Sequence, residues 1–229
     1  MRISQTPAPP RQSAQRAFSA LPLAQTWLDA LAQSGYDAMT PVQAAVLPLV
    51  LAGHDLILPM PSEDDSIVAL AVAVLHRLDP RRFDVQALVF CPTRDRAERV
   101  AQCAQRIARC AGYIKVATLC NGASMRQQID RLIHGAHIAV GTPGRLLDHV
   151  DAASLDLRAV NTLVFDEADL MLDMGFVDDL AFVASRCPKA RQTLLLHGSA
   201  DPEPAPDVVR LGRRWMRRPR MLALIPPAM

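Results

Sequence analysis

The feature that most constrains the fold is a succession of short apolar runs, each followed by a segment with helical periodicity. The seven runs are Asp55–Leu58, Val85–Cys91, Ile114–Cys120, His137–Gly141, Thr162–Phe165, Gln192–Leu196 and Met221–Leu224. The helical segments that separate them lie near 66–78, 94–111, 124–134, 143–150, 175–186 and 206–217. Apolarity that is continuous along a strand, rather than alternating, indicates burial on both faces. The pattern predicts a three-layer α/β domain in which helices cover both faces of a parallel sheet.

The same pattern indicates how the chain is organised. Residues 1–17 are rich in Pro, Gln, Ser and Arg and are predicted to form a flexible N-terminal tail. Two helices are expected before the first strand, one over 23–32 and one that Thr40-Pro41 opens. The chain has 229 residues, of which 50% are hydrophobic, and this is enough for one α/β core but hardly for two. We therefore expect a single domain over 18–226.

Composition and charge restrict the function classes. The formal net charge is only +2, so no overall electrostatic attraction to nucleic acid is expected. The chain contains no run of about 18 apolar residues and no signal-peptide core, and its five cysteines show no C-x-x-C spacing. These features favour a cytoplasmic protein with reduced thiols and argue against a membrane span, disulfides or a zinc site. A local arginine cluster is compatible with a solvated helix face or with an RNA-backbone contact. It consists of Arg210, Arg213, Arg214, Arg217, Arg218 and Arg220.

Polar motifs follow several of the predicted strands. Asp166-Glu167-Ala168-Asp169 comes directly after one buried run, Pro92-Thr93-Arg94 follows another, and Gly122 and the segment Thr142–Arg145 follow two more. Taken alone, the acidic pair could cap a helix, and Thr142-Pro143-Gly144 could be a simple turn into a helix. Ligands of parallel sheets bind at the carboxyl ends of the strands, where all of these motifs are predicted to lie.

The ordered set of motifs resembles the first RecA-like domain of DEAD-box RNA helicases. The resemblance covers roughly Phe18 to Leu224 and implies a three-layer RecA-like fold of the P-loop NTPase type. The segments that carry it are MTPVQAAVLP, LAGHD, QALVFCPTR, GTPGRLLDH, NTLVFDEADLMLDMGF and RQTLLL.

The resemblance also implies roles for individual residues. Gln43 would read the adenine edge, Phe18 would stack on the base, and Thr40 would support the loop. Asp166 would hold Mg²⁺ through water and Glu167 would orient the attacking water, while Asp169 would link to a later motif that couples hydrolysis to unwinding. The predicted path for the RNA backbone consists of Pro92, Thr93, Arg94, Gly122, Thr142, Pro143, Gly144 and Arg145.

The chain departs from the family pattern where the phosphate-binding loop is expected, at Pro61–Ile67. Counting without gaps from Gln43 places the family's lysine at Ser66 and its metal-binding threonine at Ile67. The two glycines become Glu63 and Asp65, next to Asp64. Glycine amides cradle phosphates, lysine neutralises their charge and a hydroxyl ligates Mg²⁺, so this loop is predicted to be degenerate. Ser62 is predicted instead to cap the following helix, with Asp65 returning a bond to the amide of Ser62.

A second departure affects the later motif, which aligns without gaps with His197, Gly198 and Ser199, or after a two-residue shift with Ser199-Ala200. We therefore expect its link to Asp169 to be altered. Because the sequence runs to Met229, the family's second RecA-like domain is expected to be absent from this chain.

These features predict an RNA helicase-like protein reduced to its N-terminal lobe. It would bind single-stranded RNA weakly or bind a protein partner, with ATPase and unwinding activity impaired or lost. No cofactor is expected to bind well, although the resemblance implies Mg-ATP. One alternative is a non-catalytic interaction protein that has kept only the fold and docks on a helicase or ribosomal assembly. Another is an ATP-binding helicase domain that works through an unusual phosphate site.

Overall fold

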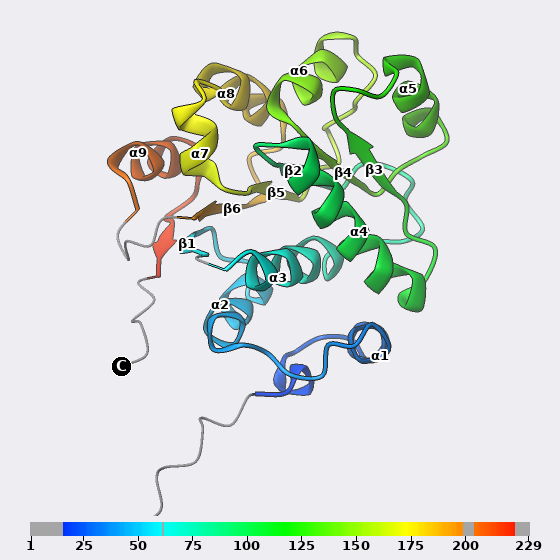
Figure 1. Cartoon of the computed structure of the whole chain (residues 1–229), viewed down its shortest axis with the longest axis vertical. Coiled ribbons are helices and arrows are strands. Elements are labelled where there is room, and N and C mark those ends of the chain that lie inside the picture. The colour runs from blue at the N-terminus through cyan, green and yellow to red at the C-terminus, as the bar shows by residue number, and fades with distance from the viewer. Residues whose placement is uncertain (1–15, 61, 199–203, 223–229) are drawn as a thin grey trace, which may run out of the picture.

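The centre of the protein is one sheet of seven parallel strands, seen in a computed structural model that describes residues 16–60, 62–198 and 204–222 (Figure 1). The strands are β1 (Leu56–Pro59), β2 (Ala87–Phe90), β3 (Val116–Leu119), β4 (Ile138–Gly141), β5 (Thr162–Phe165), β6 (Gln192–His197) and β7 (Arg220–Met221). Their spatial order is β3-β4-β2-β5-β6-β1-β7, and every neighbouring pair is parallel. The predicted fold class is confirmed.

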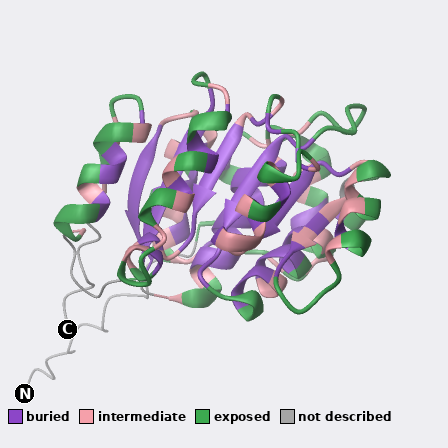
Figure 2. Cartoon of the chain, turned by 90° about the horizontal axis from the view of Figure 1, so that it is seen from above, coloured by how far each residue is buried: buried purple, intermediate pink, exposed green. Residues whose placement is uncertain are grey.

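Helices lie on both faces of this sheet, and Figure 2 shows the buried strands enclosed between them. They are η1 (Phe18–Ala20), α1 (Gln25–Gln33), α2 (Pro41–Leu51), α3 (Glu63–Leu75), α4 (Arg94–Ala111), α5 (Met125–Ile133), α6 (Pro143–Asp151), α7 (Ala168–Asp173), α8 (Val177–Arg186) and α9 (Pro206–Trp215). Strand β2 illustrates how the layers form. Val89 faces a core shared with α1–α4, whereas Leu88 and Phe90 face a core shared with α6–α9.

Most predicted elements are found, with shifted ends. The helix predicted over 94–111 has those bounds, whereas the one predicted over 66–78 begins at Glu63 and ends at Leu75. Helix α7 was not predicted. The predicted tail over 1–17 and the end of the domain beyond Leu222 lie largely outside the described residues. Within the described residues, no helix is both long and apolar enough to pass through a bilayer.

The strand register aligns the polar motifs along one edge of the sheet. Phe90, the last residue of β2, pairs with Gly141 at the end of β4 and with Phe165 at the end of β5. The residues that follow these three strands therefore lie at the same level. This confirms the expectation that Thr93, Thr142 and Asp166 share the carboxyl edge.

Candidate functional site

The acidic turn begins where β5 ends. The amide of Asp166 donates to the carbonyl oxygen of Phe90 at 2.9 Å, which continues the sheet contact by one residue. Glu167 then adopts a left-handed backbone with φ of 51°, and α7 starts at the next residue. A non-glycine residue in this conformation costs about 1 kcal/mol or more, and such strain is concentrated at functional sites. The turn buries Asp166, which is 1% exposed, and leaves the side chain of Glu167 33% exposed.

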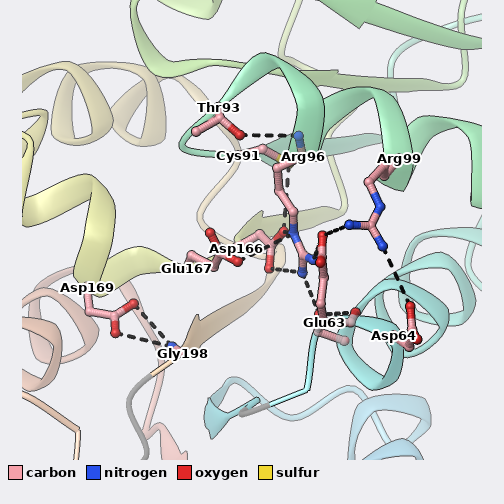
Figure 3. A network of polar contacts seen from close by, with 11 residues as sticks. Glu63, Asp64, Cys91, Thr93, Arg96, Arg99, Asp166, Glu167, Asp169 and Gly198 are labelled. Atoms are coloured by element: carbon pink, nitrogen blue, oxygen red, sulfur yellow. Dashed lines mark hydrogen bonds and ion pairs between the residues drawn. The ribbon is translucent and has the colours of Figure 1, made fainter.

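A buried arginine binds the carboxylate of Asp166 (Figure 3). Arg96 Nε lies 2.6 Å from Oδ2 of Asp166, and Arg96 Nη2 lies 3.1 Å from Oδ1, so both carboxylate oxygens are engaged by one guanidinium fork. Arg96 Nη2 also donates to the hydroxyl of Ser66, and Nη1 lies 3.0 Å from Oε1 of Glu63. Glu167 lies further away, with Oε1 at 3.8 Å from Arg96 Nε. Arg96 therefore joins the acidic turn to the first turn of α3.

Arg96 reaches this position because it lies on the apolar face of α4. Val100, Cys103 and Ile107 follow it at helical spacing and are all buried. The hydroxyl of Thr93 caps the helix by accepting the amide of Arg96 at 3.2 Å. Arg96 was not among the residues predicted for this site. The signal that could have found it is a charged residue on the stripe that otherwise forms the buried face of the helix.

The charges of this network shift one another's pKa values. Burial raises the pKa of Asp166, and the hydrogen bond and charge of Arg96 oppose that rise. Burial also raises the pKa of Glu167, and the charge of Asp166 adds to the effect. For Arg96, burial works toward a lower pKa, but the bonds and charges of Asp166, Glu167 and Glu63 outweigh it and the pKa is raised. Arg96 is therefore a permanent cation inside the site.

The first turn of α3 is capped by a serine hydroxyl and carries three carboxylates. Ser62 is the N-cap residue, as predicted, and its hydroxyl accepts the amide of Asp65 at 3.5 Å. The expected return bond would use the amide of Ser62, which adjoins residue 61 outside the described residues, and it stays a prediction. Glu63 binds Arg99 as well as Arg96, so these bonds overcome the effect of burial and lower its pKa. Asp64 lies 3.6 Å from Arg99.

Ser66 and Ile67 occupy the two positions where the family pattern has a lysine and a threonine. The hydroxyl of Ser66 donates to the carbonyl oxygen of Glu63 at 2.8 Å and also accepts from Arg96. Ile67 is 7% exposed and belongs to the core under α1–α4. Neither side chain points an unused polar group toward the acidic turn.

Of the residues predicted to bind adenine, Gln43 contacts the first turn of α3. Gln43 Oε1 accepts the amide of Thr40 at 3.1 Å, and the hydroxyl of Thr40 accepts the amide of Gln43 at 3.3 Å, which forms a capping box at the start of α2. Gln43 Nε2 donates to the carbonyl oxygen of Asp65 at 3.4 Å. Phe18 is 3% exposed and packs in the core under α1–α4. Their roles toward a nucleotide stay predictions.

The residues predicted to contact RNA gather around the turn that follows β3. A Cβ atom on Gly122, whose φ is +90°, would lie 2.5 Å from Nη1 of Arg94, so the glycine allows that side chain to approach. Arg145 Nε donates to Oδ1 of Asn121 at 3.0 Å, and its Nη1 donates to the carbonyl oxygen of Ala123 at 3.2 Å. Arg145 is therefore bonded to this turn, whereas Arg94 lies against it and pairs with Glu98 at 2.7 Å.

Thr142 and Pro143 form the start of α6 on the same edge, with Thr142 as the N-cap and Pro143 at the first helical position, next to Gly144. The hydroxyl oxygen of Thr142 is buried and has no hydrogen-bond partner among the described residues. Pro92 is buried at the end of β2, between Cys91 and the exposed Thr93.

The segment after β6 contacts the acidic turn through its backbone. The amide of Gly198 donates to both carboxylate oxygens of Asp169, each at 3.2 Å (Figure 3). Ser199, the remaining hydroxyl of this motif, lies outside the described residues. His197 ends β6 and is 1% exposed, and neither of its ring nitrogens has a hydrogen-bond partner in the described part of the chain. A link between Asp169 and this segment is therefore present, although it uses a peptide group.

Comparisons with known proteins bear on the family and the fold of this chain. The family model described as "DEAD/DEAH box helicase" matches residues 40–205. The ATP-dependent RNA helicase DbpA of Escherichia coli is 47% identical over 178 residues, which are 78% of this chain and 38% of that protein. The ATP-dependent RNA helicase CshA of Listeria monocytogenes is 34% identical over 207 residues, which are 90% of this chain and 39% of that protein.

A solved structure gives the same result for the fold. The crystal structure of a DEAD box protein from Methanococcus jannaschii matches with a TM-score of 0.82 at 28% identity, over 90% of this chain and 55% of that one. The chain spans about two fifths of the length of the curated relatives described above. With the family model covering most of the sequence and the fold shared with a solved member, the chain belongs to the DEAD/DEAH box helicase family, and its domain has the RecA-like DEAD-box fold.

Proposed function

We propose that this chain is a DEAD-box helicase lobe that binds single-stranded RNA weakly and in which binding and hydrolysis of Mg-ATP are impaired or lost. The observation that carries the proposal is the guanidinium fork of Arg96 on Asp166. In the family pattern this carboxylate serves a metal ion. Here an internal cation that cannot leave the chain already neutralises it.

The residues around Asp166 do not fit a metal-bound triphosphate. Glu63 and Asp64 flank the place that the phosphates would occupy, together with Asp65, and Ile67 has no oxygen for a metal. At ~4 Å and an effective dielectric constant of about 20, one close pair of like charges costs on the order of 4 kcal/mol. The positive end of the α3 dipole is already neutralised by these carboxylates, so a phosphate gains little there.

The RNA part of the proposal rests on the opposite half of the carboxyl edge. Arg94 is exposed, Arg145 is held at the turn beside Gly122, and Thr142 and Pro143 start a helix on the same edge. Arginine forks and backbone amides near glycine suit phosphate oxygens. With few such contacts and a net charge of +2, binding should be sequence-independent and salt-sensitive, with a Kd on the order of tens of micromolar or weaker.

Calorimetric titration with adenosine, AMP, ADP and Mg-ATP tests the nucleotide site. We expect any residual affinity to rank adenosine or AMP above ATP, because those ligands bring less negative charge to the carboxylates. The combination Glu63→Gly, Asp65→Gly, Ser66→Lys and Ile67→Thr should recover little Mg-ATP binding by itself, because Arg96 still occupies Asp166. Adding Arg96→Leu to that combination should recover more. RNA-stimulated ATP hydrolysis by the unaltered chain, abolished by Glu167→Gln, would overturn this part of the proposal.

Fluorescence anisotropy with a labelled single-stranded RNA tests the other part. The variant Arg94→Ala/Arg145→Ala should bind several-fold more weakly at low salt, and its affinity should depend less steeply on salt concentration. Arg158→Ala/Arg210→Ala is a control matched in charge, because it also removes two arginines that pair with carboxylates at the surface. Equal losses in the two double variants would contradict the assigned path. If the parent bound no RNA at all, the role of a protein-binding lobe would replace the RNA-binding one.

A further inference from the structure

Two aromatic side chains stand exposed at the amino edge of the sheet, opposite the site described above. Phe83 precedes β2 and is 50% exposed, and Tyr113 precedes β3 and is 69% exposed. Their ring centroids are 6.3 Å apart with planes inclined at 61°. Large aromatic side chains usually bury most of their surface, and the whole chain has only two tyrosines and six phenylalanines. Two neighbouring rings open to solvent are therefore a feature to explain.

The ammonium group of a lysine lies over both rings. Lys115 Nζ lies 5.6 Å from the ring centroid of Phe83 and 5.5 Å from that of Tyr113. The ammonium group donates to the carbonyl oxygen of His134 at 2.7 Å, which fixes its position and leaves two of its three protons for other acceptors. Gly135 allows this packing, because a Cβ atom there would lie 2.9 Å from Cβ of Phe83.

A basic cavity of about 490 Å³ adjoins the rings. Its wall includes Arg109, Lys115, Arg131 and His134, and Asp130 is its one carboxylate. Arg109 lies in the last turn of α4 and Arg131 in the last turn of α5. We call Phe83, Tyr113, Lys115, Arg109 and Arg131 the amino-edge patch.

We propose that the amino-edge patch binds single-stranded nucleic acid, with bases stacked on Tyr113 and Phe83 and phosphates held by Lys115, Arg109 and Arg131. Aromatic faces combined with a cationic groove are what sequence-independent single-strand binding requires, since every base has a π-face and every nucleotide a phosphate. A protein-docking surface would be expected to be poorer in charge at its centre. The inference rests on the proposed function for its class of ligand, but it places the contact at a different surface.

The two surfaces lie at opposite ends of the same three neighbouring strands. The amino ends of β3, β4 and β2 carry the patch, and their carboxyl ends carry Gly122, Thr142 and Arg94. Each of these strands has four residues at ~3.3 Å per residue, so the strands themselves span only about 13 Å between the two edges. A single-stranded nucleic acid that passes over β3, at the edge of the sheet, could contact both surfaces.

Anisotropy with labelled oligouridylate tests the patch directly. Phe83→Ala/Tyr113→Ala should weaken binding at least ~5-fold, the effect of losing one stacked base. Lys115→Gln should weaken binding less, and it should reduce the slope of log K against log salt concentration by about 1. Tyr113→Trp should retain affinity, and the fluorescence of the new indole should be quenched on saturation. Oligothymidylate should behave like oligouridylate, whereas binding of a blunt RNA duplex should not respond to Tyr113→Ala, because its bases are already stacked.

Phe182→Ala is the matched control, because Phe182 is also an exposed ring, at 36%, with the guanidinium of Arg186 centred 4.6 Å from its centroid. It lies on α8, outside the patch, and its loss should not change binding. If Phe83→Ala/Tyr113→Ala loses affinity and Arg94→Ala/Arg145→Ala does not, the patch is supported and the RNA path at the carboxyl edge is rejected. The reverse result would reject the patch and leave the proposed function intact. Unchanged affinity in Phe83→Ala/Tyr113→Ala, or a loss equal to that of Phe182→Ala, overturns the inference, as does a parent chain that binds no single strand.

Discussion

At the scale of single residues, the bond between Arg96 and Asp166 makes a sharp prediction about stability. Both side chains are almost fully buried, since that of Arg96 is 4% exposed and that of Asp166 is 1% exposed. Removing one member of such a pair leaves an uncompensated buried charge and costs about 3–5 kcal/mol. Arg96→Met should therefore lower the free energy of unfolding by about that amount in urea denaturation.

The double variant Arg96→Met/Asp166→Leu should regain most of that loss, because a buried ion pair is often replaced by apolar side chains at little net cost. Arg82→Met provides the surface control, since Arg82 pairs with Asp84 in a bridge whose two side chains are each 57% exposed. Exposed pairs contribute about 0–1 kcal/mol. If Arg96→Met cost no more than Arg82→Met, the proposed neutralisation of Asp166 by Arg96 would be wrong.

This residue also shows where sequence reasoning stops. The acidic turn could be predicted because it directly follows the apolar run of its strand in the sequence. Arg96 could not be assigned a role in the same way, because its partner Asp166 lies 70 residues further along the chain. An arginine on a helix is usually solvated. The apolar stripe indicates that Arg96 is buried, but it does not indicate which carboxylate Arg96 binds.

At the scale of elements, the start of α3 predicts a modest helix-capping effect. Ser62→Ala should lower the free energy of unfolding by about 0.5–1 kcal/mol, because the 3.5 Å bond to the amide of Asp65 is long for a cap. Thr93→Ala removes the shorter cap of α4, at 3.2 Å, and should cost as much or more. Urea denaturation of both variants measures the difference. A loss near zero for Ser62→Ala would show that the carboxylates alone stabilise this helix end.

The boundaries of elements were predicted less well than their existence. Hydropathy alone places the start of α3 at Ser66, three residues late, because it ignores the capping and dipole effects that extend a helix into a polar segment. The predicted N-cap at Ser62 places the start at Glu63, where the helix begins. Helix α7 was missed because the turn before it depends on Glu167 in a left-handed conformation, which usually requires glycine. In contrast, the strand predicted over Thr162–Phe165 has those bounds, since burial on both faces leaves a sharp apolar run.

At the scale of the whole molecule, the apolar runs predict that the sheet is parallel, but they do not predict the order of its strands. Continuous apolar runs indicate central parallel strands, but they do not say which strand lies beside which. The crossover that places β2 between β4 and β5 is visible only in the structure. The amino-edge patch could not be predicted for the same reason, because Phe83 and Tyr113 come from different loops and Arg131 comes from α5.

The whole molecule should also lose stability in mild acid through buried histidines. Burial lowers the pKa of His149 and of His197, and the charge of Arg145 adds to the effect at His149. His149 has ring contacts to Ser154 at 2.8 Å and to Gln128 at 2.9 Å, whereas the His197 ring has no partner among the described residues. Both rings are therefore held neutral in the folded state.

The sign of the effect follows from proton linkage. The unfolded chain takes up these protons near pH 6.5, but the folded chain takes them up only at lower pH, because its pKa values are depressed. The stabilisation is complete above pH 6.5 and is lost as the pH falls through the folded pKa values, at up to about 1.4 kcal/mol per pH unit for each histidine. Asp166 and Glu167 act in the opposite direction, since their raised pKa values favour the folded state as the pH falls.

A difference between variants isolates the histidine contribution from that of the carboxylates. His197→Leu removes two unpartnered ring nitrogens from a buried position at the end of β6, so it should be neutral or stabilising at pH 7.5. Its melting temperature should then fall less than that of the parent between pH 7.5 and pH 5.5. His134→Gln, at an exposed position, should follow the parent. Parallel curves for the parent and His197→Leu would mean that His197 accepts its proton in the folded chain as easily as in the unfolded one, and burial would then not govern its titration.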